Sequence, residues 1–177
     1  MSSVEETVAA LRAGEPVLLP TDTVYGLCGA ERDDVRVRIA ELKGRDVAQP
    51  IALLFADVDA AVARTPGLRG AAHVLPGPFT LVVSGLGIRV PELPPEAAAV
   101  VRELGAVLAT SANLHGGPDP RRLDEVPGSI RSACAAEIDS GELAGVASTV
   151  VDLTGPEPRV LREGAVPAEE ALARLRA

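Results

Sequence analysis

Cationic and polar side chains stand in close pairs at two points of this 177-residue chain. Lys43 and Arg45 are two residues apart, and so are Ser111 and Asn113. An arginine can bind a phosphate or carboxylate through two parallel hydrogen bonds, whereas a lysine offers a point charge. Both pairs also have interpretations without a ligand, as a helix C-terminus that favours cations and as a polar turn that caps the next segment. Taken singly, each pair leaves both interpretations open.

Two further arginines occupy positions where an unpaired guanidinium would be energetically unfavourable or could contact a ligand. Arg89 lies in the apolar run 88–90, so it needs an anion or a position at a sheet edge. Arg162 ends a predicted strand, where a surface ion pair with Glu163 or Asp152 is the alternative to a ligand contact. Together with the two pairs above and several hydroxyls, these arginines favour the binding of a small polyanion such as a nucleotide.

The composition limits the classes of function. The formal net charge is −8, which argues against a broad phosphate-binding face but leaves room for a small basic pocket. Aromatic residues make up only 2%, which argues against stacking of nucleic-acid bases. Two cysteines and two histidines are too few and too scattered for a zinc site. No signal peptide or membrane span is evident, and we expect a reducing cytoplasm.

The segment LLPTDTVYGLCGA, residues 18–30, is the stretch around which the other elements must be arranged. An apolar run is followed by a polar turn with Thr21, Asp22 and Thr23, and then by a second apolar run. Ligand crevices of open α/β sheets lie at such strand ends, although the hydroxyls and the carboxylate could equally well cap the backbone of an ordinary loop.

Hydrophobic periodicity and turn residues predict alternating helices and strands. Helices are expected over 4–13, from 33 or 34 to 43, near 58–62, over 68–75, over 95–104, within 123–135 and from 167 onward. Strands are expected over 16–19, 25–29, 51–55, 79–83, 88–90 and 106–109, near 137, and over 148–153 and 159–162, with 79–83 and 88–90 antiparallel. This succession predicts one α/β domain with a mixed sheet over residues 1–177.

The sequence resembles the threonylcarbamoyl-AMP synthases, the YrdC-like family, from about residue 16 to residue 166. The resemblance is carried by seven short motifs in register: PTDTVYGL (20–27), the K-x-R pair of ELKGRD (41–46), LPGPFTLV (75–82), IRVP (88–91), TSAN (110–113), STVVD (148–152) and VLREGAV (160–166). The chain resembles the short members of the family, which lack an additional C-terminal domain.

The resemblance implies a fold and an activity. The expected fold is a twisted mixed β-sheet with flanking helices around a large, positively lined cavity. The expected reaction makes L-threonylcarbamoyl-adenylate and pyrophosphate from ATP, L-threonine and bicarbonate, with Mg²⁺ on the phosphates. A separate complex would transfer the product to tRNA beside the anticodon, so little direct binding of nucleic acid, no membrane association and a cytoplasmic location are expected.

The resemblance also implies roles for individual residues. Residues expected to hold ATP and the adenylate are Lys43, Arg45, Gln49, Ser111, Asn113, Arg121 and Arg162, with Lys43 and Arg45 as the expected catalytic residues. Residues expected to bind threonine are Thr23, Arg89 and Ser148, with Arg89 pairing the carboxylate.

Several positions depart from the family pattern. Leu54 replaces a frequent histidine near the threonine, and His115 stands where serine usually precedes glycine. Asp46, Gln49 and Arg121 also differ from the residues that are common there. Two alternatives therefore stay open: a same-fold enzyme acting on another amino acid or carbamoyl substrate, and a non-catalytic nucleotide- or RNA-binding paralogue.

Overall fold

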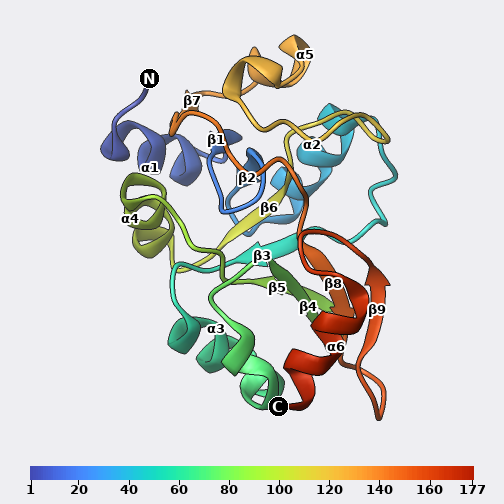
Figure 1. The fold of residues 1–177 in the computed structure, drawn as a ribbon. Helices are drawn as coiled ribbons and strands as arrows, with labels where there is room; N and C mark the ends of the chain where they lie inside the picture. Colours follow the sequence, from blue (N-terminus) through green and yellow to red (C-terminus); the bar gives the residue numbers. More distant parts are fainter.

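The computed structural model describes residues 1–177 as a twisted nine-stranded sheet with helices on both faces (Figure 1). The strand order is β7-β1-β2-β6-β3-β5-β4-β8-β9, and parallel and antiparallel neighbours are mixed. The strands are β1 (Val17–Leu19), β2 (Gly26–Gly29), β3 (Ala52–Leu54), β4 (Phe79–Val83), β5 (Leu86–Arg89), β6 (Val107–Ser111), β7 (Ala136–Glu137), β8 (Thr149–Asp152) and β9 (Arg159–Arg162).

Six α-helices and two short 3₁₀ helices connect these strands. The helices are α1 (Val4–Ala13), α2 (Asp33–Lys43), α3 (Val58–Arg64), η1 (Pro66–Val74), α4 (Pro95–Leu104), η2 (Leu123–Glu125), α5 (Gly128–Arg131) and α6 (Ala168–Arg176). Helix α1 begins at a capping box, in which Ser3 and Glu6 each accept a hydrogen bond from the other's backbone N–H, and it ends at Gly14 in the left-handed conformation.

The sequence-based prediction of an α/β fold with a mixed sheet is confirmed, and several local predictions need correction, among them the strand expected over 88–90, which is β5 over 86–89. The N-cap of α2 is Arg32, because Asp33 and Asp34 lie inside the first helical turn. The predicted helix 68–75 is a 3₁₀ helix, and the region 123–135 holds two short helices instead of one. Strand β6 runs two residues beyond the predicted end and includes Ser111.

A large apolar core covers one whole face of the sheet. Leu18, Leu27, Leu53 and Leu81 point from four strands into this core. Side chains of α2, α3, η1, α5 and α6 cover them from the other side. Since the strand positions on this face are consistently apolar, this core fixes the register of the sheet.

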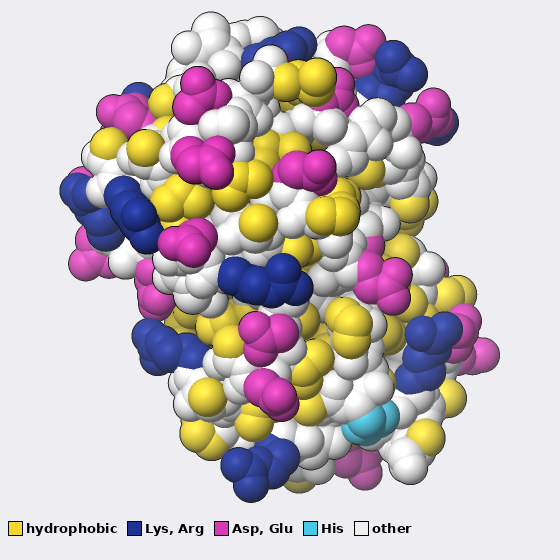
Figure 2. All heavy atoms as spheres, turned by 90° about the vertical axis from the view of Figure 1, so that its left-hand side faces the viewer, with side chains coloured by type: hydrophobic (Ala, Val, Ile, Leu, Met, Phe, Trp, Pro, Cys, Tyr) yellow, Lys and Arg dark blue, Asp and Glu magenta, His cyan; other side chains and the backbone are white.

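A smaller core covers only part of the opposite face. Helices α1 and α4 pack against each other and against alternate residues of β1, β2 and β6, such as Val17, Cys28 and Val107. The space-filling view of this side shows acidic and basic side chains interspersed over its surface (Figure 2). Neither helix contributes a residue to the lining of a cavity that lies on the same face of the sheet, above β3, β4, β5 and β8.

Candidate active site

The cavity lies on the part of the sheet that the smaller core leaves uncovered, and its volume is about 260 Å³. In β4, Phe79, Leu81 and Val83 point into the large core, while Thr80 and Val82 line the cavity. This alternation follows directly from the two-residue period of a strand. The same period gives β8 a core residue, Val151, next to a cavity residue.

Three neighbouring strands give the cavity a floor of very small residues. Ala109 of β6 pairs with Ala52 of β3, and Gly87 of β5 lies beside Ala52. A Cβ atom on Gly87 would lie 3.4 Å from the Cβ of Ala52 and 3.3 Å from Cγ2 of Thr80. Small residues at adjacent strand positions thus leave the space above the sheet open.

Arg89 is the most deeply buried charge in the cavity wall, with 9% of the residue exposed. Its Nη2 donates to Oδ1 of Asp22 at 2.9 Å and to Oγ1 of Thr23 at 3.2 Å. Burial lowers the pKa of Arg89 and raises that of Asp22, and in each case the partner's charge opposes the shift. Nε of Arg89 and Oδ2 of Asp22 have no partner, so this pair retains unused hydrogen-bonding capacity.

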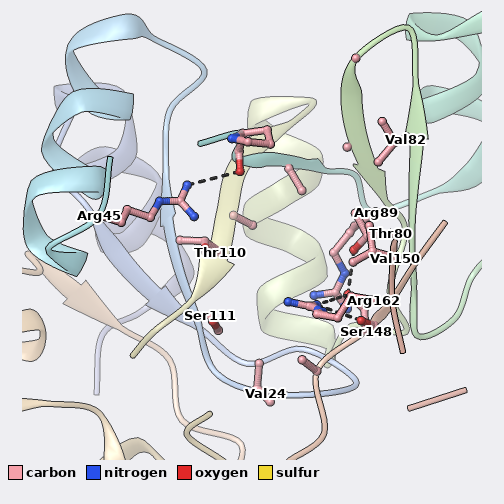
Figure 3. Close-up of a pocket in the computed structure, with 16 residues that line it drawn as sticks. Val24, Arg45, Thr80, Val82, Arg89, Thr110, Ser111, Ser148, Val150 and Arg162 are labelled. Carbon is pink, nitrogen blue, oxygen red and sulfur yellow. Dashed lines mark hydrogen bonds between the residues drawn. The ribbon is translucent and has the colours of Figure 1, made fainter. Parts of the chain in front are cut away.

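Next to Arg89, a group of hydroxyls is tied to a second arginine (Figure 3). Nη2 of Arg162 donates to the backbone oxygen of Ser148 at 2.9 Å, and the hydroxyls of Ser148 and Thr80 are 2.7 Å apart. Register explains this grouping, because Val150 of β8 pairs with Thr80 on one side and with Arg162 on the other. Asp152 instead pairs with Arg159, so the alternative ion pair with Arg162 is absent.

Arg45 lies on the wall opposite Arg89 and Arg162 (Figure 3). Its Nη2 contacts only the backbone oxygens of Gln49 and Pro50, both at 3.4 Å, and its Nε is buried without a partner. Burial lowers the pKa of Arg45, but a guanidinium stays protonated in proteins. Arg45 is therefore a cation in the cavity wall without a counter-charge bound to it.

Lys43 does not line the cavity but lies directly behind Ser111, which does. Its Nζ donates to the backbone oxygens of Ser111 and Asn113 at 2.5 and 2.6 Å and to Oδ1 of Asn113 at 2.8 Å. The Ser111 hydroxyl donates to the same Oδ1 at 2.7 Å. The two pairs singled out in the sequence therefore form one hydrogen-bonded unit.

The ten residues expected at the site fall into three groups. Five line one cavity: Arg45, Arg89, Ser111, Ser148 and Arg162. Three lie behind the wall in contact with lining residues: Thr23, Lys43 and Asn113. Two are exposed and outside the lining, Gln49 and Arg121, and Arg121 is paired with Glu142.

Sequence reasoning gave no specific role to Asp22 or Thr80. In the sequence Asp22 stands out only as part of a polar turn, because nothing local indicates that it pairs with an arginine 67 residues away. The feature that could have identified Thr80 as a cavity residue is its hydroxyl in an otherwise apolar strand, at a position that alternates with core residues. Leu54 is 1% exposed and belongs to the smaller core, so its side chain does not line the cavity.

Fold and cavity together define an α/β protein whose mixed sheet presents arginines and hydroxyls to one cavity. The profile of the Sua5/YciO/YrdC family, described as "Telomere recombination", matches residues 9–164. The chain belongs to this family, as its motifs predicted.

No helix of the structure has the length and apolar character needed to cross a bilayer.

Among curated proteins, the chain is similar to a putative threonylcarbamoyl-AMP synthase of Mycobacterium tuberculosis and to the threonylcarbamoyl-AMP synthase of Bacillus subtilis. The first is 35% identical over 94% of this chain and 86% of its own length. The second is 33% identical over 94% of this chain and 55% of its own length. The chain thus spans most of the first protein and about half of the second.

Two solved structures share the fold. Escherichia coli YciO superimposes with a TM-score of 0.83 and 25% identity, over 96% of this chain and 92% of that protein. Pyrococcus abyssi Sua5, solved in complex with L-threonine, gives a TM-score of 0.78 and 29% identity over 97% of this chain and 56% of that protein.

Proposed function

We propose that this protein is a threonylcarbamoyl-AMP synthase, which makes threonylcarbamoyl-AMP and pyrophosphate from L-threonine, bicarbonate and ATP for the modification of tRNA. The observation that carries the proposal is the meeting of Arg45, Arg89 and Arg162 around one cavity, although these residues are far apart in the sequence. The curated relatives that bear the name of this activity support the same function.

The nucleotide occupies the side of the cavity formed by Arg45 and Ser111. Arg45 has no bound counter-charge, so it is suited to neutralise phosphate oxygens. Arg162 and the unit of Lys43 and Asn113 complete this side in the proposal. Gln49 and Arg121 lie outside the lining, so any contribution from them requires a movement of their segments toward the ligand.

Threonine occupies the side formed by Arg89 and Ser148. The Arg89 guanidinium is held at Nη2 by Asp22 and Thr23, and its remaining donors are left for the substrate carboxylate. The hydroxyls of Ser148 and Thr80 can donate to and accept from the substrate hydroxyl. This arrangement supplies polar contacts to the amino acid without the histidine that Leu54 replaces.

The reaction requires positioning more than covalent catalysis. The amine of threonine forms a carbamate with bicarbonate and releases water. A carbamate oxygen then forms a bond to the α-phosphorus of ATP, while the bond from that phosphorus to the bridging oxygen breaks and pyrophosphate leaves. Arginines preorganised around the phosphates stabilise the charge that develops on them, and no side-chain nucleophile is needed.

Magnesium enters the proposal with ATP. The cavity lining contains arginines, hydroxyls and small apolar residues but no carboxylate, and the structure has no cluster of three or more His, Cys, Asp or Glu side chains. The residues present therefore do not form a magnesium site of their own, and the ion would be held by phosphate oxygens and water.

Pyrophosphate release from ATP and bicarbonate, compared across threonine, serine and valine, tests the proposal. We expect threonine to stimulate release most strongly. Stronger stimulation by another amino acid would favour the same-fold enzyme with a different substrate. ATP binding without stimulation by any amino acid would favour a non-catalytic paralogue. The product is a labile mixed anhydride, so we propose that it is transferred in the cytoplasm by a separate tRNA-modifying complex.

A further inference from the structure

Lys43 is a cation whose three hydrogen-bond donors are all used within the protein. It is the last residue of α2, and 4% of it is exposed. An ammonium group has three N–H donors, and three oxygens of Ser111 and Asn113 lie 2.5 to 2.8 Å from Nζ. In addition, the backbone oxygen of Lys43 accepts from the N–H of His115 at 2.8 Å. The end of α2 therefore holds the segment after β6 at two points.

This contact determines how Asn113 and Ser111 are presented. Oδ1 of Asn113 accepts from both Lys43 and Ser111, so its amide nitrogen must face the other way, where it donates to Gly117 at 2.7 Å and Asp119 at 3.3 Å. The Ser111 hydroxyl commits its proton to Asn113 and leaves its oxygen lone pairs at the cavity wall. Each of these orientations depends on the ammonium group behind the wall.

We propose that Lys43 is a positioning residue, which orients Asn113 and Ser111 for the nucleotide and does not contact the nucleotide itself. This inference rests on the proposed nucleotide site and assigns Lys43 a role different from that of its neighbour Arg45. Arg45 lines the cavity without a bound counter-charge, whereas Lys43 is enclosed by protein oxygens. Moving Nζ to a phosphate would deprive three acceptors of this donor, two of them in buried contacts, which is costly.

A double-mutant cycle on ATP binding tests the proposal. We expect Lys43→Met to weaken ATP binding about tenfold in the wild-type background, but less than about twofold in an Asn113→Ala background, because the amide through which Lys43 orients the Ser111 hydroxyl and acts on the nucleotide site is already gone. The matched control is Arg45→Met, whose loss should be the same in both backgrounds. A full loss for Lys43→Met in the Asn113→Ala background would overturn the proposal. Circular dichroism establishes that each variant is folded.

A structure of the wild-type protein with a non-hydrolysable ATP analogue is a second test of the proposal and needs no variant. We expect Nζ of Lys43 to keep its three protein oxygens, and a direct bond to a phosphate oxygen would overturn the proposal. Pyrophosphate release by the wild type tests the proposed function separately. If the wild type released no pyrophosphate, ATP binding could still be compared among the variants. Failure of the wild type to bind any nucleotide would overturn both.

Discussion

Arg89 and Asp22 form the ion pair with the smallest exposure in the structure, 11% and 12% of their side chains. Asp22→Asn would leave a buried guanidinium without its counter-charge, which typically costs about 3–5 kcal/mol. We therefore expect a clear fall in thermal stability, and partial recovery on addition of threonine or sulfate, because either anion can replace the lost charge. Thermal unfolding with and without these anions measures both effects.

The control for this prediction is Arg159→Gln. Arg159 pairs with Asp152, but 74% of its side chain is exposed, so the change should alter stability by less than about 1 kcal/mol. An Asp22→Asn protein as stable as this control would show that Arg89 does not depend on Asp22.

Substitution of Arg45 tests whether this cation, which has no bound counter-charge, acts on the phosphates of ATP. We expect Arg45→Met to lower the rate of pyrophosphate release by about 100-fold or more, because a preorganised charge at the phosphates is lost. The fold should survive, since the side chain contacts only two backbone oxygens at 3.4 Å. Arg69→Met is the control, because Arg69 is exposed in η1 and lies outside the cavity. Near-normal activity of the Arg45 variant would mean that this residue is only a helix end.

We expect nucleotide binding to depend on pH through Lys43. Burial, with a smaller contribution from repulsion by Arg45 and an opposing attraction from Asp119, lowers the pKa of Lys43 to about 8. Above that pH the neutral amine has only two donors for three oxygens, so ATP binding should weaken as pH rises through about 8. Calorimetric titration between pH 7 and 9 in wild type and Lys43→Met checks this, since the variant should lack the Lys43-dependent part of the decline.

The same pKa shift predicts that global unfolding does not cause this loss. Because the folded-state pKa lies below the ordinary value of 10.5, the unfolded chain binds more protons between about pH 8 and 10.5. The contribution of Lys43 to the free energy of unfolding therefore increases with pH in that window.

At the scale of elements, the close approach of two loops to the cavity wall gives a sharp prediction. A Cβ atom on Gly164, just after β9, would lie 2.2 Å from the backbone oxygen of Ala147 and 2.6 Å from that of Ser148. Gly164→Ala must therefore push apart the segments that carry Arg162 and Ser148. We expect a loss of about 1–3 kcal/mol in stability and a raised KM for threonine.

Gly70→Ala is the control for this effect, because no atom lies within 4 Å of the added Cβ there. Chemical denaturation and steady-state kinetics on both variants separate the two outcomes. An unchanged KM in a destabilised Gly164→Ala protein would show that the position of Ser148 does not affect substrate binding.

Local pattern predicted most elements but not how they combine. The apolar run 79–83 and the strand 159–162 were predicted with their observed bounds, because side-chain period and flanking turns are local signals. The placement of β6 between β2 and β3 was not evident, since it depends on packing across the whole sheet. For the same reason, the cationic pairs could be singled out, whereas the contact of Lys43 with residues 68 and 70 positions away could not.

For the whole molecule, the charge distribution predicts weak interaction with tRNA. The net charge is −8, so a large polyanion such as tRNA meets a net repulsion from the protein. We expect a tRNA dissociation constant weaker than about 0.1 mM at about 0.15 M salt. Mobility-shift titration measures it, and micromolar binding would support an RNA-binding paralogue.

The alternation of core and cavity residues along β4 also links folding to function in an all-or-none way. If this strand slipped by a single position against its neighbours, Leu81 would enter the cavity and Thr80 and Val82 would be forced into the core. A misaligned strand therefore loses its apolar contacts and its cavity-lining groups in the same event. The register that is most stable for β4 is therefore also the one that forms its part of the cavity wall.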